Sequence, residues 1–207
     1  MGAEWEIRFG PDNRFRIFYE VDLIAHISVF SFQEPSERAL AKNIPRDKMG
    51  NSEPDITKKI RALLNENSIT FQEIDHEPAI TCEQSAKARG CSQEIGGKSI
   101  LFKDRSDFRL FVMSAALQVD SKKVRKILDS SWLRFATTKE LWEMAGVEKG
   151  ALPPFGRDIL PVDLYLDESI LKNDKIAFNA GMVTKSFIMK VKDYLKVIDP
   201  IICSFAK

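Results

Sequence analysis

The sequence contains few of the residues that hydrolases and metalloproteins most often use for covalent or metal chemistry. It has two histidines, His26 and His76, and three cysteines among 207 residues. No G-x-S-x-G nucleophile motif and no H-E-x-x-H zinc motif occurs, so the sequence offers no basis for a Ser-His-Asp triad. Two histidines also leave zinc without a convincing set of ligands. We therefore expect neither a metal nor a cofactor.

The cysteines are too few and too widely spaced for a disulfide framework. Cys82, Cys91 and Cys203 are odd in number and form no C-x-x-C pair, which is typical of buried or partly buried thiols in a reducing compartment. The sequence also shows no signal-peptide pattern at its start and no apolar run long enough to cross a bilayer. These absences predict a cytoplasmic protein without a membrane partner.

Charge of one sign is not in excess either. The 31 basic and 30 acidic residues give a formal net charge of +1. We therefore expect no broad cationic surface for a long duplex, and any contact with nucleic acid should be local. With 44% hydrophobic and 29% charged residues, the chain is long enough for one well-filled core and a small appendage.

The appendage is predicted at the amino terminus. Three β-prone runs predict a meander, at residues 7–9, 15–19 and 26–30, and a turn at residues 10–13 separates the first two. Residues 34–53 are rich in proline, charged and small polar residues, which predicts a linker with at most one turn of helix at 36–41. We divide the chain into a β-meander with its linker, residues 1–50, and a main domain, residues 52–207.

The main domain alternates helical and strand patterns, which predicts an α/β fold with a mixed, mostly antiparallel sheet and surrounding helices. Thr81 and Gln84 form a capping-box pattern that begins one helix, and Gly90 ends it. Further helices are expected over residues 54–67, from Ser121, from Thr138, and over 167–171 and 191–197. Strands are expected over residues 69–75, 100–102, 108–113, 133–135, 162–166, 175–178 and 186–189.

The stretch Gly96-Gly97-Lys98-Ser99 places a lysine at the start of an apolar run that is too short for a helix. The two glycines allow close backbone approach, and residues 100–102 predict a buried strand that pairs with 108–113 as an antiparallel hairpin. A phosphate loop is excluded, because Ser92 stands where G-x-x-x-x-G-K-[ST] requires its first glycine and a strand follows where that motif requires a helix. Lys98 is either a solvated lysine at a strand end or a cation that faces a cleft.

Residues 146–161 form a second informative stretch. Three glycines and three prolines forbid a regular element there, at Gly146, Gly150, Gly156, Pro153, Pro154 and Pro161. Glycine permits unusual backbone angles while proline stiffens the loop, and together they can present backbone N–H groups at a fixed point. A plain surface loop is the alternative.

Four motifs, taken in order, resemble the YbaK/ProX family of aminoacyl-tRNA deacylases. They are His76-Glu77-Pro78, Lys98-Ser99-Ile100-Leu101, the Gly-Ala-Leu-Pro-Pro-Phe-Gly run at 150–156, and Phe178-Asn179-Ala180-Gly181. Each motif is weak alone, but four in the family's order form a much stronger pattern. The resemblance covers roughly residues 52–207. It implies that the lysine at the strand's start, the G-x-x-x-P loop and the late glycine-containing turn line one pocket.

The resemblance also implies an activity, the hydrolysis in trans of the ester of a mischarged tRNA. The pocket would hold the aminoacyl group on the terminal adenosine, with a water or the adenosine's 2′-hydroxyl as the nucleophile. Lys98 and Gly150 are the implied catalytic positions: the amine opposes charge that develops on the ester oxygen, and backbone groups around the glycine position the ester. The implied substrate-binding residues are Ser99, His76, Pro154, Phe155, Gly156, Asn179 and Gly181.

Several alternatives stay open. His76 either caps a turn through backbone hydrogen bonds or takes part in the site. Phe71, Ile80, Met113 and Leu152 are candidates to set the pocket's size, and the family favours a small amino acid such as alanine, serine or cysteine. The partners implied are the acceptor end of a mischarged tRNA and an aminoacyl-tRNA synthetase. The alternative function is a non-catalytic module that captures a tRNA 3′ end or an amino-acid-like ligand.

Two charged stretches have more than one interpretation. The basic residues of the helix from Ser121 form either a solvated face or a contact for the tRNA backbone; they are Lys122, Lys123, Arg125 and Lys126. Residues 8–16 and Tyr19-Glu20 resemble the carboxy-terminal half of RelE/ParE-type toxins, but the helices that precede the sheet in those toxins are absent here. Without that cover we expect a vestigial or fusion-derived sheet that docks on a neighbour, in preference to a ribonuclease.

Overall fold

The computed structural model describes residues 3–9, 15–21, 27–33 and 53–207, and it divides the chain into two compact units, Met1–Ser52 and Glu53–Lys207. In the first unit three strands pair antiparallel in sequence order: β1 (Ala3–Phe9), β2 (Phe15–Val21) and β3 (Ile27–Gln33). The predicted meander strands are therefore present. The turn expected at 10–13, the helical turn at 36–41 and most of the expected linker lie outside the described residues.

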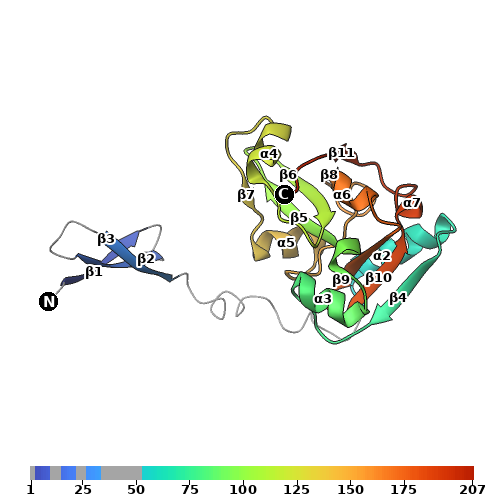
Figure 1. The fold of residues 1–207 in the computed structure, drawn as a ribbon, viewed down its shortest axis with the longest axis horizontal. Coiled ribbons are helices and arrows are strands. Elements are labelled where there is room, and N and C mark those ends of the chain that lie inside the picture. The colour runs from blue at the N-terminus through green and yellow to red at the C-terminus, as the bar shows by residue number, and fades with distance from the viewer. Residues whose placement is uncertain (1–2, 10–14, 22–26, 34–52) are drawn as a thin grey trace. The chain divides into compact units, whose positions relative to one another are not determined.

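The second unit contains two sheets (Figure 1). The smaller sheet has the antiparallel order β4-β10-β9, and the larger has the order β11-β8-β6-β5-β7 with parallel pairing of β8 to both β6 and β11. Their strands are β4 (Phe71–Asp75), β5 (Gly97–Lys103), β6 (Phe108–Ser114), β7 (Arg134–Phe135), β8 (Asp163–Asp167), β9 (Lys175–Met182), β10 (Lys185–Lys190) and β11 (Ile201–Cys203). The mixed α/β class is confirmed. The strands are split between two sheets, however, which a parallel bridge between Gly96 and Ala177 connects.

Helices cover both sheets, and their first residues follow from local capping. They are α2 (Asp55–Glu66), α3 (Cys82–Arg89), α4 (Ser121–Ile127), α5 (Thr138–Ala145), α6 (Glu168–Leu171) and α7 (Val191–Tyr194), with a 3-10 turn η4 (Gln93–Ile95) before β5. The capping box of Thr81 with Gln84 and the left-handed Gly90 are confirmed. Helix α4 begins at Ser121 as expected, and Asp120 is its cap. Thr138 was expected to cap α5, but the cap is Thr137, because its extended backbone lets the side chain accept a free N–H group of the first turn.

Two clusters of buried side chains form the core. The larger cluster joins α2 to β9 and β10 through residues such as Ile60, Phe178 and Phe187. The smaller cluster lies under α4 and consists of Phe102, Phe111, Met113, Val124 and Phe205. On β5, Leu101 belongs to the larger cluster while Phe102 belongs to the smaller one, as expected when neighbouring strand residues point to opposite faces.

One expectation about the end of the chain was wrong, and one strand there was missed. Residues 179–181 were expected to form a turn, but they lie inside β9, where Asn179 pairs with Ser186 of β10. Asparagine and glycine favour turns locally, and here the pairing of buried strands overrides that preference. The short strand β11 after Pro200 was not predicted, because three residues carry no readable alternation. Among the described residues no helix is long and apolar enough to cross a membrane.

Candidate active site

A polar network links three of the four sequence motifs, and its centre is Arg89 at the end of α3. The guanidinium donates to Ser186 Oγ at 2.8 Å, to Asn179 Oδ1 at 2.6 Å and to the Ala177 carbonyl at 3.3 Å. Ser186 Oγ also lies 3.0 Å from Asn179 Oδ1. The network therefore holds the end of α3 against β9 and β10.

His76 joins this network through its imidazole. Nδ1 lies 2.8 Å from the Glu77 carbonyl and must carry the proton of that bond, because a carbonyl only accepts. Nε2 lies 2.7 Å from Ser186 Oγ. The structure thus contains both features weighed for His76, a backbone hydrogen bond in a turn and a place beside other motif residues.

Asn179 connects the network to the glycine-proline loop. Its amide nitrogen donates to the Gly150 carbonyl at 2.9 Å and to the Ala79 carbonyl at 3.1 Å. The Gly181 N–H also donates to the Ala151 carbonyl at 3.0 Å. The Asn179 side chain and the Gly181 N–H of β9 therefore fix the start of the loop by hydrogen bonds.

Gly150 must be glycine for two independent reasons. Its φ of +92° lies in the left-handed region, and a Cβ there would lie 2.9 Å from the Ile80 carbonyl oxygen. Gly181, with φ +91°, is equally constrained, because its Cβ would lie 2.5 Å from Ile56 Cγ2 of α2. Gly150 lets the loop approach the segment before α3 at Ile80, and Gly181 lets β9 approach α2.

The backbone of Lys98 lies close in sequence to Gly96, which pairs with β9, but its amine donates to a residue outside this network. Nζ donates to the Leu117 carbonyl at 2.6 Å, and no described carboxylate forms an ion pair with it. Gly96 pairs with Ala177, which Arg89 also contacts, and two residues of strand span about 7 Å. We call the Gly96–Ala177 bridge the β5–β9 junction: Arg89 contacts it directly, and Lys98 lies two residues from it along β5.

The charge on these two groups is not neutralised within the described part of the chain. All partners of Arg89 are neutral oxygens, and burial lowers its pKa. Removing a cation from water is costly unless an anion or several hydrogen bonds compensate it. The junction is therefore electrostatically suited to an anionic group or a developing oxyanion.

The hydroxyl of Ser99 is a further unsatisfied group beside Lys98. Its Oγ is buried and has no hydrogen-bond partner among the described residues. Buried polar atoms are paired in the great majority of cases, so such an atom needs an explanation. A polar ligand that reaches β5 would supply one.

Pro154, Phe155 and Gly156 are structural parts of the loop. Phe155 is 1% exposed and packs edge-on against the rings of Phe178 and Tyr194, and the Tyr194 hydroxyl donates to the Pro154 carbonyl. Full burial raises the pKa of Tyr194. These contacts anchor the loop's second half in the larger cluster, so Phe155 presents little surface to a substrate.

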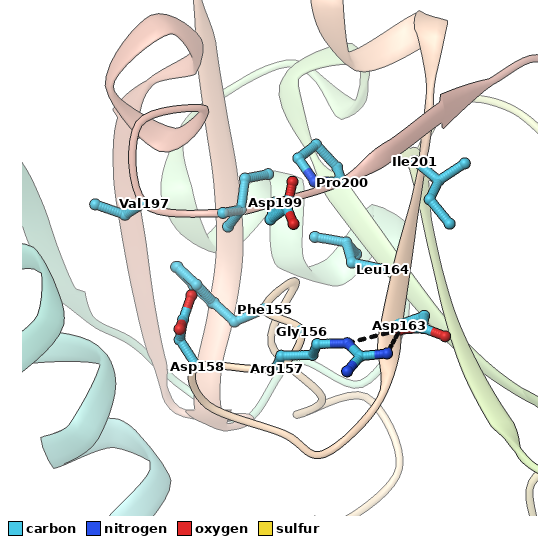
Figure 2. A pocket seen from close by; sticks show the side chains of 11 residues that line it. Phe155, Gly156, Arg157, Asp158, Asp163, Leu164, Val197, Asp199, Pro200 and Ile201 are labelled. Atoms are coloured by element: carbon cyan, nitrogen blue, oxygen red, sulfur yellow. Dashed lines mark hydrogen bonds and ion pairs between the residues drawn. The ribbon is translucent and has the colours of Figure 1, made fainter.

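A cavity of about 350 Å³ lies on the outer side of this anchor (Figure 2). Its lining includes Phe155 and Gly156 but none of Lys98, Gly150 or Asn179. Figure 2 shows the Arg157 guanidinium directed toward Asp163, with Nε 2.8 Å from Oδ1, while Asp158 and Asp199 add two further carboxylates. This negative wall repels phosphate, so we do not place a tRNA end there.

The structure thus unites some predicted residues and separates others. His76, Gly150, Asn179 and Gly181 meet at β9, whereas Lys98 shares the β5–β9 junction without a side-chain bond to them. That Lys98 and Gly150 line one pocket stays a prediction. Of the proposed size-setting residues, Met113 is fully buried in the smaller cluster and Ile80 is 55% exposed.

Sequence reasoning missed Arg89 and Ser186. An arginine in the last turn of a helix is ordinarily a solvated complement to the helix dipole, and Ser186 stands in a short strand with no motif around it. No local signal distinguishes either residue. Among the described residues no cluster of three or more His, Cys, Asp or Glu side chains could hold a metal ion.

Comparison with known proteins agrees with the motif order. The family described as the aminoacyl-tRNA editing domain matches residues 76–197. A multifunctional Ser/Thr-tRNA deacylase, ProXp-y of Escherichia coli K12, is 30% identical over 157 residues, which cover 72% of this chain and 92% of the relative. The prolyl-tRNA editing protein ProX of Acetoanaerobium sticklandii is 22% identical over 149 residues, covering 70% of this chain and 91% of the relative.

The fold agrees as well. A crystal structure described as a candidate trans-editing enzyme for prolyl-tRNA synthetase superposes with a TM-score of 0.66 at 21% identity, covering 75% of this chain and 99% of that one. At this identity the likeness concerns the fold alone. The family match spans more than half of the sequence, and the chain therefore belongs to the aminoacyl-tRNA editing domain family.

Proposed function

We propose that the second unit is an aminoacyl-tRNA deacylase that hydrolyses the ester of mischarged tRNA in trans. One structural observation supports the proposal: Arg89, which has no carboxylate partner in the described chain, bonds Asn179, and Asn179 in turn holds the Gly150 carbonyl. Lys98, whose amine also has no carboxylate partner there, lies on β5, which the Gly96–Ala177 bridge connects to β9. Family membership supports the reaction class, and the E. coli relative is named for deacylation of Ser- and Thr-tRNA.

The proposed reaction needs no protein nucleophile. A water attacks the ester carbonyl carbon and gives a tetrahedral oxyanion. Attack by the 2′-hydroxyl of the terminal adenosine gives the same kind of oxyanion but only moves the aminoacyl group to the 2′ oxygen, so a water must still attack that ester to complete hydrolysis. Collapse of this intermediate breaks the bond to the ribose oxygen, which leaves with a proton. With water the products are the free amino acid and a tRNA with an intact 3′ end. The barrier falls when a cation and fixed dipoles face the oxyanion.

Lys98 is the residue we assign to that cation. Its amine bonds a neutral carbonyl at the end of a flexible stem, and exchanging this oxygen for an anionic one is favourable because charge-assisted bonds are about twice as strong. Ser99 would touch the amino acid or the adenosine. Gly150 would place a backbone group at the ester, and Asn179 would hold that glycine in position.

The remaining predicted residues have supporting roles in this proposal. Pro154, Phe155 and Gly156 stiffen the loop, Gly181 allows β9 to approach α2, and His76 fixes Ser186. The acceptor end of the tRNA is the part that enters the site. We also propose a small amino acid as the group removed, a cytoplasmic location, and delivery of the tRNA by a synthetase.

A panel of tRNAs charged with serine, threonine, alanine, cysteine and proline tests the activity under multiple-turnover conditions. Lys98→Ala should lose most hydrolysis of the preferred substrate while remaining folded, and Lys98→Arg should retain part of it. Lys59→Ala is the matched control, because Lys59 is an exposed lysine on α2. Saturable binding without turnover by the wild-type protein would instead identify a binding module, and full activity of Lys98→Ala would refute the role of the amine.

A further inference from the structure

Positive charge is concentrated in one part of the sequence although the whole chain is nearly neutral. Residues 98–139 contain ten lysines and arginines and four acidic residues, a net charge of +6, whereas the entire chain carries +1. The rest of the chain is therefore net negative. Such a local excess is the electrostatic signature of a polyanion contact.

Helix α4 presents part of this charge to solvent. Val124 is fully buried, and Ile127 and Leu128 pack against the smaller cluster, which leaves the basic side chains on the other face. Lys122, Lys123 and Lys126 are exposed and Arg125 is half-buried. Within residues 53–207 none of these four groups forms an ion pair, and Lys123 Nζ donates to the Ala206 carbonyl at 3.0 Å.

Two aromatic rings are exposed at the sheet edge that follows α4. Trp132 is 42% exposed and Phe135, on the edge strand β7, is 58% exposed. Phe135 stacks on Phe102 with 4.9 Å between ring centroids, and the Arg134 guanidinium lies 5.7 Å from the centre of the Trp132 ring. Arg134 is itself fixed by two 2.6 Å bonds to Glu140. Each ring is thus supported by a neighbour and still offers surface to solvent.

Single exposed aromatic residues are ordinary, but their combination with unneutralised cations is informative. Bases of single-stranded nucleic acid stack on aromatic rings while lysine and arginine contact the backbone. An interface between proteins would instead be depleted in lysine at its core. Figure 1 shows α4 and β7 on the same side of the second unit, away from α2, β4 and β10.

The position of these groups relative to Lys98 also fits a tRNA end. Strand alternation puts Lys98, Ile100 and Phe102 on the same face of β5, and Phe135 stacks on Phe102. From Lys98 to Phe102 the strand rises about 13 Å. A stacked single strand of about four nucleotides, the length of the unpaired 3′ end of tRNA, spans about 14 Å at about 3.4 Å each. The overhang is therefore long enough to span the distance between these rings and Lys98, although the face of β5 between them packs against the smaller cluster.

We propose that the acceptor end of tRNA docks on a surface made of the basic face of α4 and the rings of Trp132 and Phe135, which we call the α4–β7 surface. The basic residues contact phosphates, and the rings stack on unpaired bases of the 3′ end. This inference rests on the proposed function, because it names the surface that delivers the ester to the β5–β9 junction.

Binding of an uncharged acceptor-stem minihelix with its 3′ overhang tests the surface without hydrolysis. The full-length protein is titrated by fluorescence anisotropy at several salt concentrations. Lys122→Gln with Lys126→Gln should lower the slope of log K against log salt by about 1.4 to 1.8, since each phosphate contact contributes about 0.7 to 0.9. Lys59→Gln with Lys192→Gln removes the same charge from exposed positions on α2 and α7 and should leave the slope unchanged.

The rings are tested in the same assay. Phe135→Leu or Trp132→Leu should weaken binding about 5- to 100-fold, the range that loss of one base stack produces, whereas Phe135→Tyr should retain it. Circular dichroism confirms folding of each variant. Any of three results would refute docking on the α4–β7 surface. They are equal slopes for the two double variants, wild-type affinity of the leucine variants, and self-association that depends on the rings without binding of RNA. A wild-type protein that binds the minihelix through these residues but hydrolyses no aminoacyl-tRNA would refute the proposed function and leave the surface intact.

Discussion

Removing the Asn179 side chain is the sharpest test of how the Gly150 loop is held. In Asn179→Ala the Gly150 carbonyl loses its 2.9 Å donor and Arg89 Nη2 loses its 2.6 Å acceptor. The Ala79 carbonyl is less affected, because Ser85 Oγ also lies 3.4 Å from it. A neutral bond contributes about 1 kcal/mol and a bond to a charged group about 2 kcal/mol, so the expected loss of unfolding free energy is about 3 kcal/mol.

That loss should leave the protein folded and measurable. A domain of this size has a stability of about 5–15 kcal/mol, and about 3 kcal/mol corresponds to a fall in Tm of about 6–12 °C. Urea unfolding gives the free energy directly, and hydrogen exchange at Gly181, whose N–H donates to Ala151, reports loosening of the loop. The deacylation rate should fall together with the protection of the Gly181 amide against hydrogen exchange.

Asn173→Ala is the matched control. Asn173 Nδ2 also donates to two carbonyl groups, those of Glu94 and Ser169, each at 3.1 Å, but it lies nearer to solvent. Removal of the Asn173 side chain should lower the free energy of unfolding by less than about 1 kcal/mol, because water replaces its two hydrogen bonds. If Asn179→Ala is no more destabilising than this control, the asparagine does not hold the loop and our account of the site is wrong.

Three further predictions follow from the packing and the charges. Gly181→Ala should cost at least about 2 kcal/mol more in urea unfolding than Gly90→Ala, because both have positive φ but only the first meets a neighbour, Ile56 Cγ2 at 2.5 Å; equal losses would contradict the steric argument. The Arg134 guanidinium lowers the pKa of Glu140 from its ordinary 4.5 to about 2, so Glu140 stabilises the fold above about pH 4.5 and this contribution disappears as the pH falls toward 2. The stability gap between wild type and Glu140→Gln should be at most about 1 kcal/mol at pH 7, because the pair is only partly buried and solvent screens it. The gap should close in acid, and a gap that widens in acid would contradict this account. Deleting residues 1–50 should leave deacylation of the preferred tRNA unchanged, and loss of folding would show that the meander belongs to the core.

Much of the fold was predictable because its signals are local. The helix from Thr81 to Gly90 is encoded by a cap at one end and a left-handed glycine at the other, and the β5–β6 hairpin by two apolar runs around a polar turn. The one-residue error in the cap of α5, Thr137 in place of Thr138, arose because two adjacent threonines can both cap a helix. The strand status of residues 179–181 was not predictable, because it depends on pairing with β10.

The candidate site also combines features that the local sequence predicts with features that depend on the tertiary structure. The sequence by itself determined the order of the four motifs, the glycines that the backbone requires and the lack of a G-x-S-x-G motif, since each depends on residue type and short spacing. Only the tertiary structure decided that Arg89 bonds Asn179, 90 residues away, and that His76 bonds Ser186, 110 residues away. Hydrophobic burial drives the sheets together without specifying polar partners. Which donors then meet which acceptors depends on how α3, β9 and β10 pack, and that geometry is written in no single stretch of the chain.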